Sequence, residues 1–96
     1  MARTGHWLMS LDCRHVYPLR GVVVIGRAPG CEIRLADRHV SRRHCELRVD
    51  GGDVRLIDLG ARNGVFVNGH RIHDCGLHDD DVICLGRRRF RFKIVN

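Results

Sequence analysis

The stretch "CELRVDGGDVRLIDL", residues 45–59, decides the fold class of this chain. In its first part Cys45, Leu47 and Val49 alternate with charged residues, which is the period-two pattern of a strand with one face turned to a core. "DGGD" then marks a turn, and a second short apolar run follows it. The segment therefore predicts two consecutive short strands joined by a turn.

The same pattern of short strands and turns continues along the chain. Further strands are expected in "GVVVIG" (21–26), "VFVNG" (65–69), "DVICLG" (81–86) and "RRFRFKIV" (88–95). In the last segment Phe90, Phe92 and Ile94 fall on one face, and basic residues fall on the other. No window shows a sustained period of 3.6, which is typical of a sandwich or barrel without helices. We predict an all-β fold, an antiparallel β-sandwich of short strands.

Length and composition predict one domain. The 96 residues leave no room for a second core, so we expect a single domain over residues 1–96, with its core at about 7–95. No apolar run approaches the length of a membrane span, so no membrane association is expected. The start, "MARTGHWLMSLD", lacks the apolar stretch of a signal peptide, which favours a cytoplasmic location.

Cysteine and histidine usage gives no clear metal site. The five cysteines include no C-x-x-C pair, and Cys45 and Cys84 occupy positions that suit buried, free thiols in a reducing compartment. The alternative is a zinc site in the segment "HRIHDCGLH", residues 70–78. Its possible zinc ligands are His70, His73, Cys75 and His78. Their spacing matches no standard structural zinc site, so we expect an exposed loop, no metal and no cofactor.

The charge balance favours an anionic partner. Lys+Arg number 17 against 11 Asp+Glu, and Lys93 is the only lysine. Arginine is the better residue for bidentate contact with phosphate. Nucleic acid is one candidate, because "GRRRFRFK", residues 86–93, combines basic and aromatic residues. Strand alternation turns Phe90 and Phe92 inward, however, where they cannot stack on bases, so nucleic acid is not the expected partner.

Four short motifs follow one another at regular intervals. They are Gly26-Arg27, Ser41-Arg42-Arg43-His44, Asn63-Gly64 and Asn68-Gly69. In this order, and joined by matching strands from about Val22 to the end, they resemble the forkhead-associated (FHA) domain family. The resemblance implies a β-sandwich whose binding loops lie at one end and hold a phosphothreonine-containing segment. The partner would be a protein phosphorylated by a Ser/Thr kinase.

The resemblance also implies a role for each motif. Arg27, Ser41 and Arg42 would donate hydrogen bonds to the phosphate, which carries about −1.5 to −2 charges and three acceptor oxygens near neutral pH. Asn63 would hydrogen-bond the peptide main chain, although Asn63-Gly64 could also be a plain hairpin turn. The residues expected to support the site are Gly26, His44, Gly64 and Asn68.

The sequence departs from the family pattern in two places. Ala61 and Arg62 stand where the family commonly has Ser or Thr. Ala61 removes a hydroxyl that steadies the loop, whereas Arg62 adds a cation near the expected phosphate. The second departure is Asp79–Asp81, which replaces a Gly-Asp turn. Asp tolerates the left-handed conformation, so the turn is expected to survive.

Two other functions are weighed against phosphopeptide binding. His44 follows Ser41 by three residues, but no orienting acid or oxyanion hole stands at a suitable spacing, so we expect no enzyme activity. The other alternative is a scaffold that binds a partner without phosphate, through its sheet faces. The sequence predicts a phosphothreonine-dependent protein-binding module in signalling.

Overall fold

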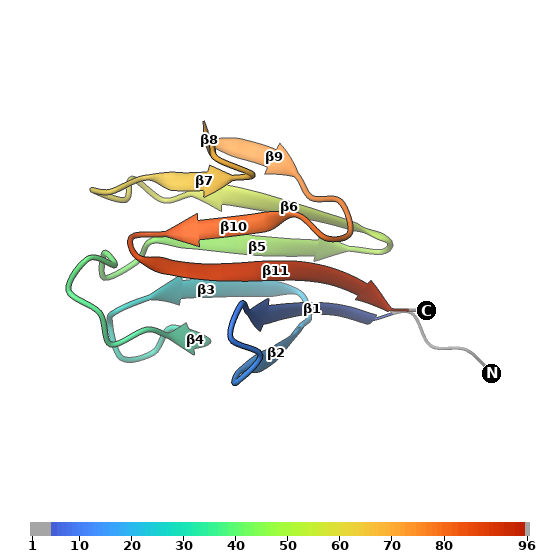
Figure 1. Ribbon diagram of the computed structural model, residues 1–96, viewed down its shortest axis with the longest axis horizontal. Helices are drawn as coiled ribbons and strands as arrows, with labels where there is room; N and C mark the ends of the chain where they lie inside the picture. The colour runs from blue at the N-terminus through green and yellow to red at the C-terminus, as the bar shows by residue number, and fades with distance from the viewer. Residues whose placement is uncertain (1–4, 96) are drawn as a thin grey trace.

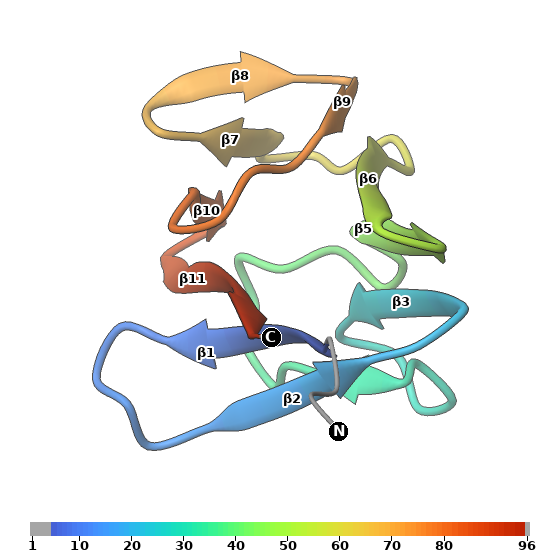
Figure 2. The same ribbon diagram turned by 90° about the vertical axis from the view of Figure 1, so that its right-hand side faces the viewer.

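The computed structural model describes residues 5–95, which form two stacked sheets (Figures 1 and 2). The strands are β1 (Gly5–Ser10), β2 (Val16–Leu19), β3 (Val22–Gly26), β4 (Ile33–Arg34), β5 (Cys45–Asp50), β6 (Asp53–Asp58), β7 (Val65–Val67), β8 (His70–Ile72), β9 (Asp74–Gly76), β10 (Val82–Leu85) and β11 (Arg88–Val95). One sheet has the order β2-β1-β11-β10-β7-β8 and the other β4-β3-β5-β6-β9. No helix that could span a membrane occurs within residues 5–95.

The predicted β-sandwich is confirmed, with one parallel strand pair. All neighbouring strands with an assigned register are antiparallel except β3 and β4, which pair in parallel through Ile25 and Ile33. The short β3–β4 connection loops back, so that Ile33 and Arg34 run beside the end of β3 in the same direction. Just before β4, the carboxylate of Glu32 accepts the main-chain N–H of Val24 at 2.7 Å, so this amide on the outer side of β3 also has a partner.

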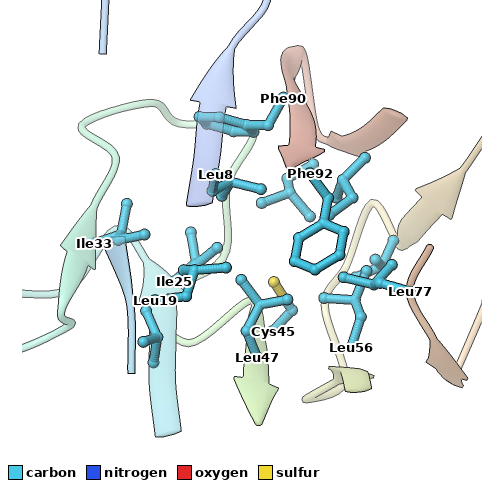
Figure 3. Packing of buried hydrophobic residues seen from close by; sticks show 14 of the residues in the cluster. Leu8, Leu19, Ile25, Ile33, Cys45, Leu47, Leu56, Leu77, Phe90 and Phe92 are labelled. Carbon is cyan, nitrogen blue, oxygen red and sulfur yellow. The ribbon is translucent and has the colours of Figure 1, made fainter. Parts of the chain in front are cut away.

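The predicted inward face of β11 is confirmed. Phe90 and Phe92 are fully buried and Ile94 is partly buried. Figure 3 shows both rings within the cluster of buried side chains that the two sheets share. Other fully buried members are Leu8, Ile25, Cys45, Leu47, Leu56, Val65, Ile83 and Leu85. The apolar faces of the two sheets thus make one core.

Strand β1 was not predicted, because its core-facing residues alternate between polar and apolar types and only Leu8 among them is apolar. His6 and Ser10 face the core, whereas Trp7 is only half-buried. Strand β1 is nevertheless central, since it pairs with β11 along its whole length. Residues 70–78, expected as an exposed loop, instead contain the edge strands β8 and β9. Edge strands bury few side chains, so their sequence lacks a strong apolar signal.

Two expectations about burial are wrong. Glu46 was expected to point to solvent but is buried, and its carboxylate forms an ion pair with the guanidinium of Arg48 at 2.5 Å. Cys84 was expected to be buried but is half-buried, on the face of β10 opposite to Ile83. All five cysteines are free, and Cys45 alone is fully enclosed, where burial raises the pKa of its thiol.

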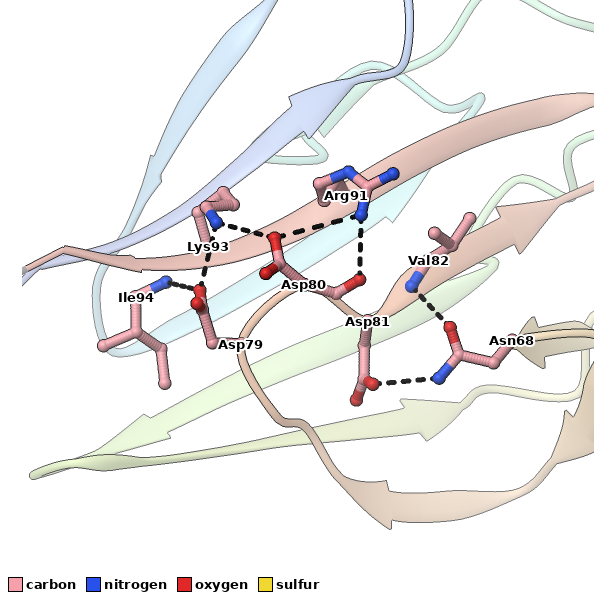
Figure 4. A network of polar contacts seen from close by, with 8 residues as sticks. All are labelled: Asn68, Asp79, Asp80, Asp81, Val82, Arg91, Lys93 and Ile94. Carbon is pink, nitrogen blue, oxygen red and sulfur yellow. Dashed lines mark hydrogen bonds and ion pairs between the residues drawn. The ribbon is translucent and has the colours of Figure 1, made fainter.

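The Asp79–Asp81 turn keeps its shape without glycine (Figure 4). Asp80 adopts the left-handed conformation, with φ of 73°. The carboxylate of Asp79 accepts the N–H of Ile94 at 2.7 Å, and Lys93 donates to Asp80 at 2.6 Å. These aspartates are therefore engaged by the last strand, and the predicted survival of the turn is confirmed.

Asn68 links this turn to β7. Its side chain donates to Asp81 at 2.9 Å and accepts the N–H of Val82 at 2.9 Å (Figure 4). Asn68 and Gly69 both have positive φ, of 51° and 84°, as a two-residue hairpin turn requires. Asn68-Gly69 is therefore the turn between β7 and β8.

The tight core predicts a large loss of stability when a buried side chain of β11 is truncated. Phe92→Ala should lower the free energy of unfolding by about 3–5 kcal/mol, because it leaves a cavity between the sheets. Urea denaturation followed by tryptophan fluorescence measures it. Arg89→Ala, an exposed position on the same strand, is the control and should change stability by less than about 0.5 kcal/mol. Equal effects of the two substitutions would contradict this packing.

The Asp79–Asp81 turn predicts a pH-dependent contribution to stability. The hydrogen bond from Ile94, followed by the nearby Lys93 ammonium, lowers the pKa of Asp79 below its ordinary value. A lowered carboxyl pKa stabilises the folded state at neutral pH, and this contribution is lost as the pH falls through about 4 towards the folded-state pKa. The stability difference between wild type and Asp79→Asn should therefore be constant from pH 7 to 5 and shrink below about pH 4.

Urea denaturation at a series of pH values measures this difference. Asp53→Asn, at the exposed first residue of β6, whose side chain forms no hydrogen bond within residues 5–95, is the matched control. A difference for Asp79→Asn that grew on acidification would contradict the assigned contacts.

Candidate functional site

Three loops meet at one end of the sandwich, on the left of Figure 1. They connect β3 to β4 (residues 27–32), β4 to β5 (35–44) and β6 to β7 (59–64). They carry all the residues expected to contact the phosphopeptide. Residues far apart in sequence therefore lie on one surface, as predicted for a sandwich.

The buried imidazole of His44 joins these loops. Its Nδ1 accepts the main-chain N–H of Ser41 at 3.0 Å, so the ring proton lies on Nε2, which donates to the carbonyl of Gly64 at 2.8 Å. The main chain of His44 bonds to Ile25 and Leu59 at 2.9 and 3.1 Å. All four polar groups of His44 are used. The ring contacts the amide of Ser41 and not its hydroxyl, so the two do not form a nucleophile–base pair.

The hydroxyl of Ser41 is oriented by the neighbouring loop. Its oxygen accepts the main-chain N–H of Arg62 at 3.1 Å. Its main-chain carbonyl accepts the N–H of Arg27 at 2.9 Å. Because the oxygen already accepts one bond, the hydroxyl hydrogen can be donated to a ligand.

Arg27 is exposed but held at one nitrogen. Its Nε donates to the carbonyl of Val40 at 3.1 Å, which directs the guanidinium along the β4–β5 loop. The two terminal nitrogens keep donors for a ligand. A guanidinium held in this way loses less side-chain entropy on binding than a free one.

Gly26 is required by a close approach of the main chain. A Cβ at Gly26 would overlap the carbonyl oxygen of Arg42. That carbonyl accepts the N–H of Ala28 at 3.1 Å, and the thiol of Cys31 lies 3.3 Å from it. The side chain of Arg42 is exposed next to Arg27 in the lining of a shared hollow.

The β6–β7 loop is steadied by Asp58, a residue that sequence reasoning missed. Its carboxylate accepts the N–H groups of Gly60 and Ala61 at 2.9 and 2.8 Å. These hydrogen bonds hold the main chain of a loop in which Ala61 provides no side-chain hydroxyl. Gly64 closes the loop with φ of 76° and a bond to the Ala61 carbonyl at 3.2 Å. The Asp-x-Gly sequence is the signal that would have found it.

Asn63 points across this loop to the β4–β5 loop. Its Nδ2 donates to the carbonyl of His39 at 2.8 Å, which leaves Oδ1 as an acceptor for a peptide N–H. The alternative of a plain hairpin turn at Asn63-Gly64 is wrong, because β6 and β7 belong to different sheets. The side chain of Arg62 is exposed beside it.

A hollow of about 480 Å³ adjoins Arg27, and two of its arginines were not predicted. Arg34 and Arg38 line it together with Arg27 and Arg42, against the single acid Asp37. Arg34 also donates to the main-chain carbonyl of Arg27 at 3.0 Å. Only the fold brings these four guanidinium groups to one hollow, since no spacing rule links them in the sequence.

Two sequence candidates lie outside this group. Asn68 follows the other end of β7 and braces the Asp79–Asp81 turn, so its expected support of the binding loops is not direct. The histidines and Cys75 of residues 70–78 do not cluster, and residues 5–95 hold no group of three side chains placed to bind a metal ion.

A family model for the FHA domain matches residues 23–86, which include all four sequence motifs. This chain belongs to the FHA domain family. In this fold the β3–β4, β4–β5 and β6–β7 loops form the end surface of the sandwich, and they carry the charged and polar residues of the sequence motifs.

The FHA chain is similar to two curated mycobacterial proteins. It is 39% identical over 67 residues to the glycogen accumulation regulator GarA of Mycolicibacterium smegmatis, which is 70% of this chain and 42% of GarA. It is 46% identical over 71 residues to the FHA domain-containing protein FhaA of Mycobacterium tuberculosis, 73% of this chain and 14% of FhaA. The chain spans less than half the length of either relative.

Solved FHA structures share the whole fold. A structure described in work on phosphothreonine-dependent FHA domain interactions is 38% identical with a TM-score of 0.89, covering 93% of this chain and 95% of the other. The FhaA FHA domain complexed with the intracellular domain of Rv3910 is 39% identical with a TM-score of 0.87, covering 92% and 99%.

The role of His44 predicts a stability defect on its replacement. His44→Leu should destabilise the domain because it leaves the partly buried N–H of Ser41 and the buried carbonyl of Gly64 without partners, at a cost of up to about 1–3 kcal/mol each. Urea denaturation measures the loss. His73→Leu, at an exposed histidine, is the matched control and should change little. Similar stabilities of the two variants would contradict the proposed joining of the loops.

Proposed function

We propose that this chain binds phosphothreonine-containing segments of a partner protein and acts in signalling by recognition alone. The observation that carries the proposal is the convergence of the Arg27 guanidinium and the Ser41 hydroxyl on one surface, both held by main-chain contacts with free donors left over. A fixed cluster of donors suits a dianion with three acceptor oxygens.

Each side chain has a distinct part in the proposed complex. Arg27 and Ser41 contact the phosphate directly, and the exposed Arg42 and Arg62 add cations beside it. The Oδ1 of Asn63 accepts a main-chain N–H of the peptide, which makes the complex specific for a peptide and not for phosphate alone. Gly26, His44 and Gly64 keep the loops in place through close approach, buried hydrogen bonds and a positive φ.

The partner is a protein modified by a Ser/Thr kinase. This assignment draws on the similarity to a structure from work on phosphothreonine-dependent interactions and on the FhaA domain bound to an intracellular domain. We place its action in the cytoplasm, where free thiols such as the exposed Cys13 persist. Residues 1–96 serve as one binding domain without cofactor or catalytic step. A regulatory role is supported by the likeness to GarA, which is named a regulator.

The role of Arg27 predicts a selective loss of binding. Arg27→Ala should weaken binding of a degenerate phosphothreonine peptide library by roughly ten- to a hundredfold, because it removes charge-assisted hydrogen bonds worth about 1.5–3 kcal/mol. Fluorescence anisotropy measures the dissociation constants, with phosphoserine and unphosphorylated libraries beside it. Arg20→Ala, an exposed arginine at the opposite end, is the control.

Two outcomes would contradict the proposal. Unchanged binding by Arg27→Ala would show that the site lies elsewhere. Equal binding of the phosphorylated and unphosphorylated libraries by the wild type would support the alternative scaffold, which binds its partner without phosphate.

A further inference from the structure

A second group of arginines lies at the same end of the sandwich, outside the proposed phosphate site. A hollow of about 300 Å³ is lined by Arg14 from the β1–β2 turn, Arg87 from the β10–β11 turn, and Arg88 and Arg89 at the start of β11. We call these four residues the arginine cluster. The main-chain N–H of Leu11 donates to the carbonyl of Arg89 at 3.2 Å, so the two turns are fixed to each other.

The arginine cluster is not neutralised within the described part of the chain. Its hollow contains one carboxylate, Asp12, whose oxygen accepts the Ser10 hydroxyl at 2.6 Å and the main-chain N–H of Arg14 at 3.0 Å. None of the four guanidinium groups forms an ion pair within residues 5–95. Four cations thus face one acid that main-chain and hydroxyl donors already engage.

Several basic residues elsewhere on the sandwich do form ion pairs. Arg91 and Lys93, farther along the same strand as Arg89, lie 3.8 and 2.6 Å from the carboxylate of Asp80. Likewise Arg55 pairs with Asp74 at 2.7 Å. These basic residues form ion pairs, whereas within residues 5–95 no arginine at the loop end does. Unpaired charge at that end raises the local concentration of anionic ligands.

The arginine cluster adjoins the proposed peptide site through His39. Gly86, which precedes the cluster, packs so closely on His39 that a Cβ there would lie 2.7 Å from its carbonyl oxygen. The same carbonyl accepts the Nδ2 of Asn63. The carbonyl of His39 therefore lies between Asn63 and the turn that carries the arginine cluster. An extended chain covers about 3.3–3.6 Å per residue, so a few residues of the ligand suffice.

We propose that the arginine cluster is a second anion subsite, which takes a carboxylate or a second phosphate of the same ligand a few residues from the phosphothreonine. This inference rests on the proposed function and narrows its ligand class to phosphothreonine segments with a flanking anionic group. The guanidinium fork suits both oxyanions, because carboxylate and phosphate accept two parallel N–H bonds.

The test compares phosphothreonine peptide libraries by fluorescence anisotropy. One library has neutral flanks, two carry three aspartates before or after the phosphothreonine, and two carry a second phosphothreonine on either side. The wild type should bind at least one flanked library about tenfold more tightly than the neutral one. The carboxylate and phosphate libraries show which oxyanion the subsite takes.

The decisive variant is Arg87→Gln/Arg89→Gln, at two exposed positions. It should lose the gain from the anionic flank and keep the affinity for the neutral phosphothreonine library. Arg20→Gln/Arg55→Gln removes the same two charges away from the loop end and should keep the gain. This control separates a local subsite from the general effect of net charge.

The outcomes separate this inference from the proposed function. Phosphothreonine binding without any gain from an anionic flank, or a gain that Arg87→Gln/Arg89→Gln retains, would overturn the second subsite alone. Failure of every phosphothreonine library to bind better than its unphosphorylated counterpart would overturn the proposed function and this inference with it.

Discussion

The hydrogen bonds of the buried His44 imidazole are the constraint on which the binding end depends. Each ring nitrogen meets a main-chain group of a different loop, so one side chain sets both the position of Ser41 and the end of the β6–β7 loop at Gly64. A buried polar group without a partner is costly, and the two loops therefore cannot separate freely. The sandwich core supports this ring by enclosing it completely.

These hydrogen bonds also keep the neighbouring donor groups in fixed positions without a ligand. The N–H of Arg62 orients the Ser41 hydroxyl, and the Val40 carbonyl holds Arg27 at one nitrogen, so the donors that remain are already directed. Binding then costs little reorganisation. Gly26 makes this compact arrangement possible, because any larger residue would collide with the main chain at Arg42.

The sequence predicted those parts of the fold in which apolar alternation and burial coincide. Phe90 and Phe92 lie in the core as expected, whereas β1 was missed because its inward residues include His6 and Ser10. Such a strand is recognised only through its long pairing with β11, which is a tertiary property. The ordered motifs predicted which three loops meet at one end of the sandwich. The convergence of Arg34 on the hollow beside Arg27 could not be predicted, because it depends on how the β3–β4 connection folds back.

The central claim is that the loops held by His44 capture phosphothreonine. Its most direct test is a two-dimensional NMR titration of the labelled domain with a degenerate phosphothreonine peptide library. The account predicts that the amide signals of residues 26–44 and 59–64 shift, led by Arg27 and Ser41, while the unphosphorylated library leaves them in place. Shifts confined to the sheet faces or to the Asp79–Asp81 turn, or equal shifts with both libraries, would contradict it.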